Sequence, residues 1–196
     1  MPMKPISLSG FASKFADDPD PWGTWNDRDE ALKRAAILHA LPPRPGGRML
    51  ELGAGNGSNS VALSRRALRL DATEATREGT DLVAKALHGS TRAKALQLVV
   101  PGRPPRPAYD AIVIAELLYY LSPRDMRCLA RQTAALLRPG ATLVLAHHRI
   151  TFYDFAQHAE GIHRRFLAAS WAPWTSRLVR QTDRWSVLSC TVAGSS

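Results

Sequence analysis

Three glycines at alternate positions, with an acid just before them, are the residues of this chain whose spacing most clearly implies chemistry. They form Glu51-Leu52-Gly53-Ala54-Gly55-Asn56-Gly57, between a short apolar stretch and an amphipathic segment. Glycine lacks a Cβ, so the backbone there can adopt positive φ and a ligand can approach it closely. A strand, a glycine-rich turn and a helix N-terminus together predict a nucleotide-sized pocket at the carboxyl end of a parallel sheet.

The spacing of these glycines narrows the class of ligand. A dinucleotide site needs G-x-G-x-x-G and a phosphate loop needs Gly-Lys-Ser/Thr, and this segment has neither pattern. A carboxylate at this position favours a cationic ligand and would repel phosphate. We therefore expect a cationic cofactor to be held by Glu51, Gly53, Ala54, Gly55 and Gly57. The alternative is an ordinary glycine-rich turn from strand to helix.

A second acid, Glu74, follows a predicted strand over residues 68–73 and lies seventeen residues after Gly57. An acid about 20 residues beyond a glycine turn binds ribose hydroxyls in nucleotide-binding folds. The alternative is a first-turn acid of the next helix, predicted over residues 76–87, because the helix dipole would also favour a negative charge there. We expect Glu74 to bind the ribose, with Asp71 as a weaker competitor.

Further polar and aromatic residues follow the fourth and fifth predicted strands. The apolar run 111–115 is followed by Glu116 and Tyr120, and His147 follows the next apolar run. Side chains at the carboxyl ends of such strands face the ligand crevice. We expect Ala115 and Tyr120 to contact the cofactor, and Glu116 and His147 to orient or deprotonate an acceptor. A cap or ion pair is the alternative for Glu116, and a hydrogen-bonded histidine at a strand end is the alternative for His147.

Helices and strands alternate along the chain. Strands separated by helices of this length predict a parallel sheet with helices on both faces. Residues 1–20 read as irregular. Helices are predicted over residues 26–41, 76–87, 122–137 and 152–169, and strands over residues 49–52, 68–73, 94–100, 111–115, 141–146, 177–181 and 185–192.

The length of 196 residues suits one domain with a full-sized core. We expect that domain over residues 26–196, preceded by an irregular segment over residues 1–25. Trp22 lies in that segment, in a stretch rich in Asp and Pro. We expect Trp22 to contact the cofactor as part of a lid, whereas a hydrophobic staple for the next helix is the alternative.

Composition sets the remaining expectations. The net charge of +9 comes from scattered arginines, with no block of like charges, which argues against a nucleic-acid partner. There is no apolar run of eighteen residues, no secretory signal pattern in residues 1–10, and no metal spacing around the two cysteines. We expect a cytoplasmic protein without a metal or a membrane span.

Three segments resemble class I S-adenosylmethionine-dependent methyltransferases. These are E-x-G-x-G-x-G at residues 51–57, Y-D-A-I-V-I at residues 109–114, and L-R-P-G-A-T-L at residues 137–143, where Ala141 replaces a second glycine. The resemblance implies a Rossmann-like α/β fold, with a seven-stranded, mostly parallel sheet and an antiparallel C-terminal strand pair. It also implies S-adenosylmethionine as cofactor, whose ammonium and sulfonium suit an acidic pocket.

Three further segments resemble the NodS-type methyltransferases, namely residues 18–22, 116–121 and 147–149, and the likeness spans about residues 16–192. That family includes the rhizobial enzyme that N-methylates a deacetylated chitooligosaccharide. Asp29 stands where a tyrosine would be expected. The resemblance implies methyl transfer to an amine or hydroxyl of a small molecule, such as a sugar derivative or secondary metabolite. A nucleic-acid-modifying methyltransferase and a non-catalytic cofactor-binding protein are the alternatives.

Overall fold

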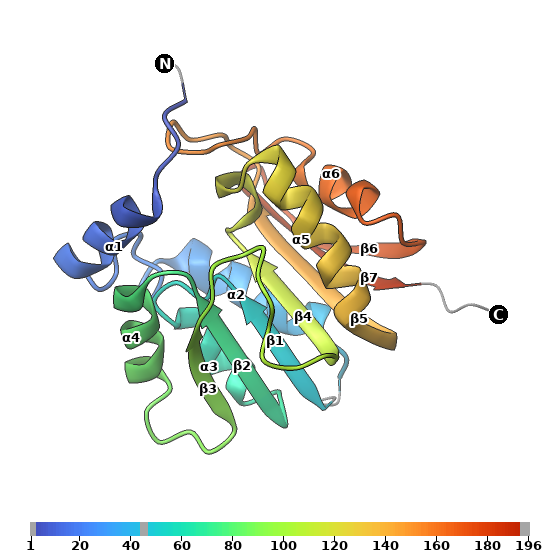
Figure 1. Cartoon of the computed structure of the whole chain (residues 1–196), viewed down its shortest axis with the longest axis horizontal. Coiled ribbons are helices and arrows are strands. Elements are labelled where there is room, and N and C mark those ends of the chain that lie inside the picture. The colour runs from blue at the N-terminus through green and yellow to red at the C-terminus, as the bar shows by residue number, and fades with distance from the viewer. Residues whose placement is uncertain (1–2, 44–46, 193–196) are drawn as a thin grey trace.

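One seven-stranded sheet organises the chain in the computed structural model, which describes residues 3–43 and 47–192 (Figure 1). The strand order is β3-β2-β1-β4-β5-β7-β6. Only β7 runs antiparallel to its neighbours, so the predicted mostly parallel sheet with an antiparallel C-terminal pair is confirmed. The strands are β1 (Arg48–Leu52), β2 (Arg69–Glu74), β3 (Ala93–Gln97), β4 (Tyr109–Ala115), β5 (Leu137–His148), β6 (Trp174–Gln181) and β7 (Trp185–Val192).

Helices cover both faces of the sheet, as predicted. In Figure 1 α5 (Pro123–Leu136) and α6 (Ile162–Ala169) lie in front of the sheet and α2 (Arg28–Ala40) lies behind it. The face behind is completed by α3 (Ser58–Ser64) and α4 (Arg77–Ala86). Two hydrophobic clusters result, one on each face.

The central strand β4 joins these two clusters. Val113 packs on the α2 side, whereas Ile112 and Ile114 pack on the α5 side, because successive side chains of a strand point to opposite faces. All three side chains are fully buried. Such continuous burial explains why the strand is an uninterrupted apolar run in the sequence.

Local capping fixes where the helices begin. Asp27 caps α2 by accepting hydrogen bonds from the backbone of Asp29 and Glu30, and Ser122 caps α5 with Pro123 in the first turn. These caps confirm the predicted starts of both helices. In the described part of the chain, no helix is long and apolar enough to cross a membrane.

Two segments differ from the sequence-based expectations. The N-terminal segment is not irregular throughout, because α1 (Leu8–Asp17) forms there, with Ser7 accepting a hydrogen bond from Gly10 N–H. This helix packs on α4, a tertiary contact that a short sequence pattern does not reveal. The predicted helix 152–169 is helical only in α6, since Gly161 adopts φ +66° just before it and the preceding residues form turns.

Candidate active site

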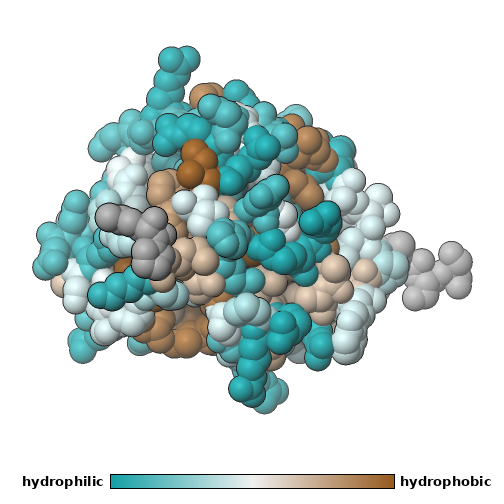
Figure 2. All heavy atoms as spheres, turned by 90° about the horizontal axis from the view of Figure 1, so that it is seen from above, coloured by the Kyte–Doolittle hydropathy of each residue, from teal (hydrophilic) through white to brown (hydrophobic). Residues whose placement is uncertain are grey.

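A cavity of about 690 Å³ opens at the carboxyl ends of the parallel strands. Its walls come from the turn after β1, the end of β2, the segment after β4, and α1 with the loop that follows it. Figure 2 views the molecule from above relative to Figure 1 and shows hydrophobic side chains exposed among hydrophilic ones on that face. The site therefore lies where an open α/β sheet is expected to bind its ligand.

The glycine turn forms one wall of the cavity. Gly53 and Gly55 have φ values of +71° and +60°, a region that other residues reach only with strain. A Cβ on Gly55 would meet nothing within 4 Å, so this position faces open space. The backbone N–H of Gly55 donates to Oε2 of Glu74 at 3.2 Å, which joins the turn to the second predicted acid.

Glu74 lines the cavity with both carboxylate oxygens already partly hydrogen-bonded. Its Oε1 accepts from the backbone N–H of Thr76 at 3.2 Å, and Thr76 caps α4, so the acid also supports the start of that helix. Burial raises the pKa of Glu74, and hydrogen bonds from Thr76 and Gly55 oppose that rise. Asp71 instead accepts from the Tyr109 hydroxyl at 3.0 Å and does not line the cavity.

The wall beside Glu74 is apolar. It is formed by Ala75, Leu98, Val99 and Val100. A carboxylate for hydroxyls, an open glycine turn and an apolar slot together fit an adenosyl group, because each part of that group finds a matching surface. All of these surfaces are formed by the chain's own side chains and backbone.

Two predicted cofactor residues lie outside the cavity. Glu51 is 2 % exposed, and its Oε2 accepts from the Ser60 hydroxyl at 2.5 Å. Burial raises the pKa of Glu51 to about 8, the Ser60 hydrogen bond opposes that rise, and the charge of Glu74 adds to it. Glu51 is thus buried away from the cavity, so the structure corrects the expectation of a carboxylate facing the ligand.

Gly57 has a packing role in place of the predicted ligand contact. It is the N-cap of α3 with φ +86°. A Cβ there would lie 2.8 Å from the Cβ of Ala86 and 3.2 Å from the Cα of Val83. The third glycine of the motif thus allows α3 to start close against α4.

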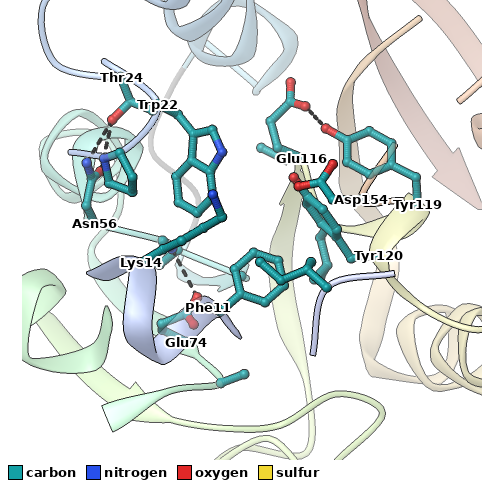
Figure 3. Close-up of a pocket in the computed structure, with 18 of the residues that line it drawn as sticks. Phe11, Lys14, Trp22, Thr24, Asn56, Glu74, Glu116, Tyr119, Tyr120 and Asp154 are labelled. Carbon is teal, nitrogen blue, oxygen red and sulfur yellow. Dashed lines mark hydrogen bonds between the residues drawn. The ribbon is translucent and has the colours of Figure 1, made fainter. Parts of the chain in front are cut away.

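Glu116 lies at the opposite end of the cavity in an ionic cluster. Its Oε2 accepts from the Tyr119 hydroxyl (Figure 3). Its Oε1 is 2.5 Å from Nζ of Lys33, and its backbone has φ +53°. The same Nζ lies 2.7 Å from Oε1 of Glu30. Lys33 is 1 % exposed, and although burial lowers its pKa, the charges of Glu116 and Glu30 raise it above the ordinary value. A buried ammonium thus holds two carboxylates at this end of the cavity.

The predicted histidine, His147, does not reach the cavity. It is fully buried, and its Nε2 accepts from the backbone N–H groups of Leu117 at 3.3 Å and Leu118 at 3.1 Å. Its Nδ1 lies 3.0 Å from Nε2 of His163, and burial, more than the neighbouring charges, lowers its pKa well below the usual range. The structure therefore corrects its role from proton acceptor to support of the turn after Glu116. The adjacent residue, His148, lines the cavity instead.

Aromatic side chains from α1 and the loop after it cover the cavity. Phe11 packs edge-on against Tyr120 at 4.9 Å between ring centroids, and Phe15 packs against Trp22 at 5.5 Å. Figure 3 shows Trp22 and Lys14 across the cavity from Tyr120. The predicted residues Trp22, Ala54, Ala115 and Tyr120 all line the cavity, whereas the α1 residues were not predicted because the segment read as irregular.

Polar contacts anchor this covering segment to the glycine turn. Nδ2 of Asn56 donates to Oδ1 of Asp20 at 2.8 Å, and the Thr24 hydroxyl donates to Oδ1 of Asn56 at 3.0 Å. Asn56 lies between the second and third glycines of the turn, and nothing in the sequence alone pairs it with Asp20. The loop carrying Trp22 is thereby tied to the cofactor-side wall.

The cavity is acidic although the chain is basic. Of the residues that the structure describes, seven carboxylates line it, against two permanently charged cations, Lys14 and Arg184, whereas the whole chain has a net charge of +9. Such a cavity favours cationic ligands and disfavours phosphates. In the described residues, no group of three or more His, Cys, Asp or Glu side chains could hold a metal ion.

Comparisons with known proteins agree with this architecture. A family model described as a methyltransferase domain matches residues 25–187. Among solved structures, the N-methyltransferase NodS from Bradyrhizobium japonicum WM9, in complex with S-adenosylhomocysteine, is similar with a TM-score of 0.79 and 17 % identity, over 95 % of this chain and 98 % of that one. This likeness confirms the fold shared with NodS-type enzymes.

Two further structures are similar at comparable levels. The DhpI complex with S-adenosylhomocysteine has a TM-score of 0.73 and 18 % identity, over 94 % of each chain. A SAM-dependent methyltransferase from Aquifex aeolicus has a TM-score of 0.69 and 15 % identity, over 96 % of this chain and 100 % of that one. No curated protein matches the chain significantly.

Proposed function

The chain belongs to the methyltransferase domain family, and from this premise we propose that it transfers the methyl group of S-adenosylmethionine to a small-molecule amine or hydroxyl. The observation that carries the proposal is one cavity with two different ends. Gly55 and Glu74 are hydrogen-bonded to each other at one end, and Glu116 with its charged partners lies at the other. The proposed donor and acceptor sites thus share one cavity.

The donor end supplies binding groups for each part of the cofactor. Glu74 would accept hydrogen bonds from the ribose hydroxyls, the turn at Gly53 and Gly55 would let the donor approach the backbone, and Leu98 and Val99 would cover the adenine. Once bound, S-adenosylmethionine supplies a methyl group already activated by a sulfonium. The protein therefore needs mainly to position the acceptor and exclude water.

The acceptor end favours an amine over a hydroxyl. Glu30 and Glu116 are only partly exposed, at 20 % and 28 % of their side chains, so their charges act across a region of reduced dielectric. An ammonium gains attraction there that a neutral hydroxyl lacks. Glu116 would hold and orient the acceptor nitrogen, which is one of the two roles expected for it. Amino sugars are the first acceptors to test, because the NodS-type resemblance points to them.

The covering segment completes the proposal. Trp22 and Phe11 would close over the bound donor and keep water from the methyl group. A nucleic-acid acceptor fits less well, since a phosphate backbone would approach a cavity rimmed by carboxylates. A non-catalytic cofactor-binding role would leave the charged cluster at the acceptor end without a function.

The decisive experiment measures donor binding first and turnover second. Titration calorimetry with S-adenosylmethionine and S-adenosylhomocysteine should give binding to the wild-type chain. Binding should weaken by about 10- to 100-fold in Glu74→Gln, since a charged hydrogen bond contributes roughly 1.5–3 kcal/mol. Glu78→Gln, on α4 and away from the cavity lining, is the matched control. Absence of binding by the wild-type chain would refute the proposal.

Acceptors are then screened by release of S-adenosylhomocysteine from mixtures containing amino sugars, simple amines or small phenols. Turnover with amines alone supports the proposed preference for amines over hydroxyls at the acceptor end of the cavity. Turnover with phenols alone contradicts that preference while leaving the methyltransferase assignment intact. Turnover that requires RNA or DNA and falls steeply with salt would favour the nucleic-acid alternative.

A further inference from the structure

His148 lies at the acceptor end of the cavity, and the proposed cofactor and acceptor contacts give its side chain no role. It ends β5, lines the cavity, and exposes 17 % of its side chain. Its Nδ1 lies 3.3 Å from the backbone carbonyl of Arg184. A carbonyl only accepts, so this contact requires a proton on Nδ1. The neutral ring then carries its lone pair on Nε2.

The surroundings of that lone pair are two carboxylates. Nε2 lies 3.9 Å from Oε1 of Glu30 and 3.9 Å from Oε2 of Glu116, beyond hydrogen-bonding distance of either. Both carboxylates also contact the buried ammonium of Lys33. Other surroundings of His148 include the ring of Phe152, edge-on at 5.6 Å, the buried His147 preceding it in the strand, and the Arg184 side chain, which lines the same cavity with its Nε 3.7 Å from Oδ2 of Asp29. Among the described residues, Nε2 thus has no hydrogen-bond partner and faces two carboxylates.

We propose that His148 is the catalytic proton acceptor of the reaction, with Glu116 holding the acceptor nitrogen beside it. This inference rests on the proposed methyl transfer and adds a residue to it. Glu116 is less suited to take the proton, because its oxygens already interact with Lys33, the Tyr119 hydroxyl and the backbone N–H of His148. His148 has one free nitrogen, and histidine is the side chain best able to exchange a proton near neutral pH.

The step balances with the groups present. The ammonium form of the acceptor loses one proton to Nε2 of His148, and the freed electron pair on its nitrogen forms the new N–C bond. The C–S bond of the donor breaks and its electron pair stays on sulfur. The imidazolium, stabilised by Glu30 and Glu116, returns its proton to water through the exposed edge of the ring. No further reactant is needed.

A first test reads the state of the ring without any turnover. Nitrogen NMR of the full chain with labelled histidine, assigned by comparison with His148→Gln, reports which ring nitrogen carries the proton. We expect Nδ1–H with an unprotonated Nε2 at mildly alkaline pH, and a doubly protonated ring as the pH is lowered. A neutral ring with its proton on Nε2, or a ring that stays doubly protonated throughout, would overturn the inference.

A second test follows kinetics with an amine acceptor from the screen. His148→Gln keeps a donor toward the Arg184 carbonyl but cannot take a proton. We expect kcat to fall by about 100-fold, with the KM for S-adenosylmethionine within about threefold, because general base catalysis contributes roughly 10²- to 10⁴-fold. If His148 is the proton acceptor, the wild-type rate should fall at low pH, and this fall should be absent in the variant. His88→Gln, exposed beyond α4, is the matched control.

The two tests separate this inference from the proposed function. A wild-type chain that binds no donor and methylates no acceptor refutes the proposed function, whereas the NMR result still decides the state of His148. Turnover by the wild type with an unchanged pH profile in His148→Gln overturns the inference and leaves methyl transfer standing.

Discussion

Lys33 and Glu116 form a 2.5 Å ion pair although 83 residues separate them in the sequence. The ammonium of Lys33 is almost completely buried and touches Glu30 as well. This pair ties α2, which follows the covering segment, to the turn after β4, which carries the acceptor-side carboxylate. The acceptor end of the cavity therefore depends on α2, a helix that contains none of the methyltransferase-like segments of the sequence.

Replacing Lys33 with methionine should destabilise the fold. The change keeps the length of the side chain but leaves two carboxylates without their cation. We expect the free energy of unfolding to fall by about 3 kcal/mol, at the lower end for a broken buried pair because both carboxylates are partly exposed. Urea unfolding measures this change. Lys85→Met, exposed on α4, is the control, and an equally small change in both variants would contradict the prediction.

The buried acid Glu51 should make stability depend on pH. Its pKa rises from 4.5 to about 8, so between these values the folded chain keeps a proton that the unfolded chain releases. The free energy of unfolding should then fall as pH rises through this window, by on the order of 1.4 kcal/mol for each unit. Glu51→Gln stays neutral, so its stability relative to wild type should improve from pH 5 to pH 8 in urea unfolding.

The control for this pH effect is Glu160→Gln, since Glu160 is exposed just before α6. Its stability relative to wild type should not change with pH in the same way. A constant difference between Glu51→Gln and wild type at both pH values would show that Glu51 titrates normally in the folded chain.

Two glycines allow backbone strain to be separated from ligand contact. Gly55 and Gly89 have φ values of +60° and +80°, and a Cβ on either meets nothing within 4 Å. Alanine at each should cost a similar amount, roughly 1–2 kcal/mol, in urea unfolding. Only Gly55→Ala places its methyl group in the cavity, so only this variant should lose affinity for S-adenosylhomocysteine in calorimetry. Equal affinities in both variants would exclude Gly55 from the donor site.

The lid role proposed for Trp22 has a natural control in Trp25, because each is 40 % exposed. Only Trp22 lines the cavity and packs against Phe15. Trp22→Ala should weaken binding of S-adenosylhomocysteine by about tenfold through loss of aromatic contact area, whereas Trp25→Ala should not. Stopped-flow measurement should assign the loss mainly to faster dissociation. Similar effects of both substitutions would favour the alternative of a hydrophobic staple for α2.

The buried pair His147 and His163 should hold the turn after Glu116. His147 accepts two backbone N–H groups through Nε2, so its proton lies on Nδ1 and points to Nε2 of His163. His163→Gln keeps an acceptor there, whereas His163→Leu removes it. Hydrogen exchange of the Leu117 and Leu118 amides should speed up at least tenfold in the leucine variant and much less in the glutamine variant. Equal exchange in both would rule out this support.

Much of the fold could be predicted because its signals are local. The buried run of β4 and the beginnings of the helices predicted over residues 26–41 and 122–137 each depend on neighbours within a few residues, and they agree with the structure to within two residues. The glycine turn and Glu74 are also local signals, since the parallel sheet brings the ends of β1 and β2 together. Successive side chains point to opposite faces of a strand, and at the end of β5 the sequence does not show which of two neighbouring histidines faces the cavity. In the structure His148 lines the cavity and His147 is buried.

The unpredicted parts of the site depend on contacts between distant segments. Lys33 belongs to the site only because the fold places it against Glu116, 83 positions away in the sequence. Phe11 covers the cavity because α1 packs on α4, a contact that no short pattern encodes. Glu51 resembled a ligand carboxylate, but the start of α3 brings Ser60 over it and closes it off.

The last strand has a consequence for how the protein is made. β7 lies between β5 and β6, and the indole of Trp185 at its start donates to Asp29 at 2.8 Å, across 156 residues of sequence. A ribosome therefore releases α2 long before the partner that fixes it has been synthesised. Nascent chains halted before β7 should remain susceptible to proteolysis at α2, even though every residue proposed to bind the methyl donor has already been synthesised.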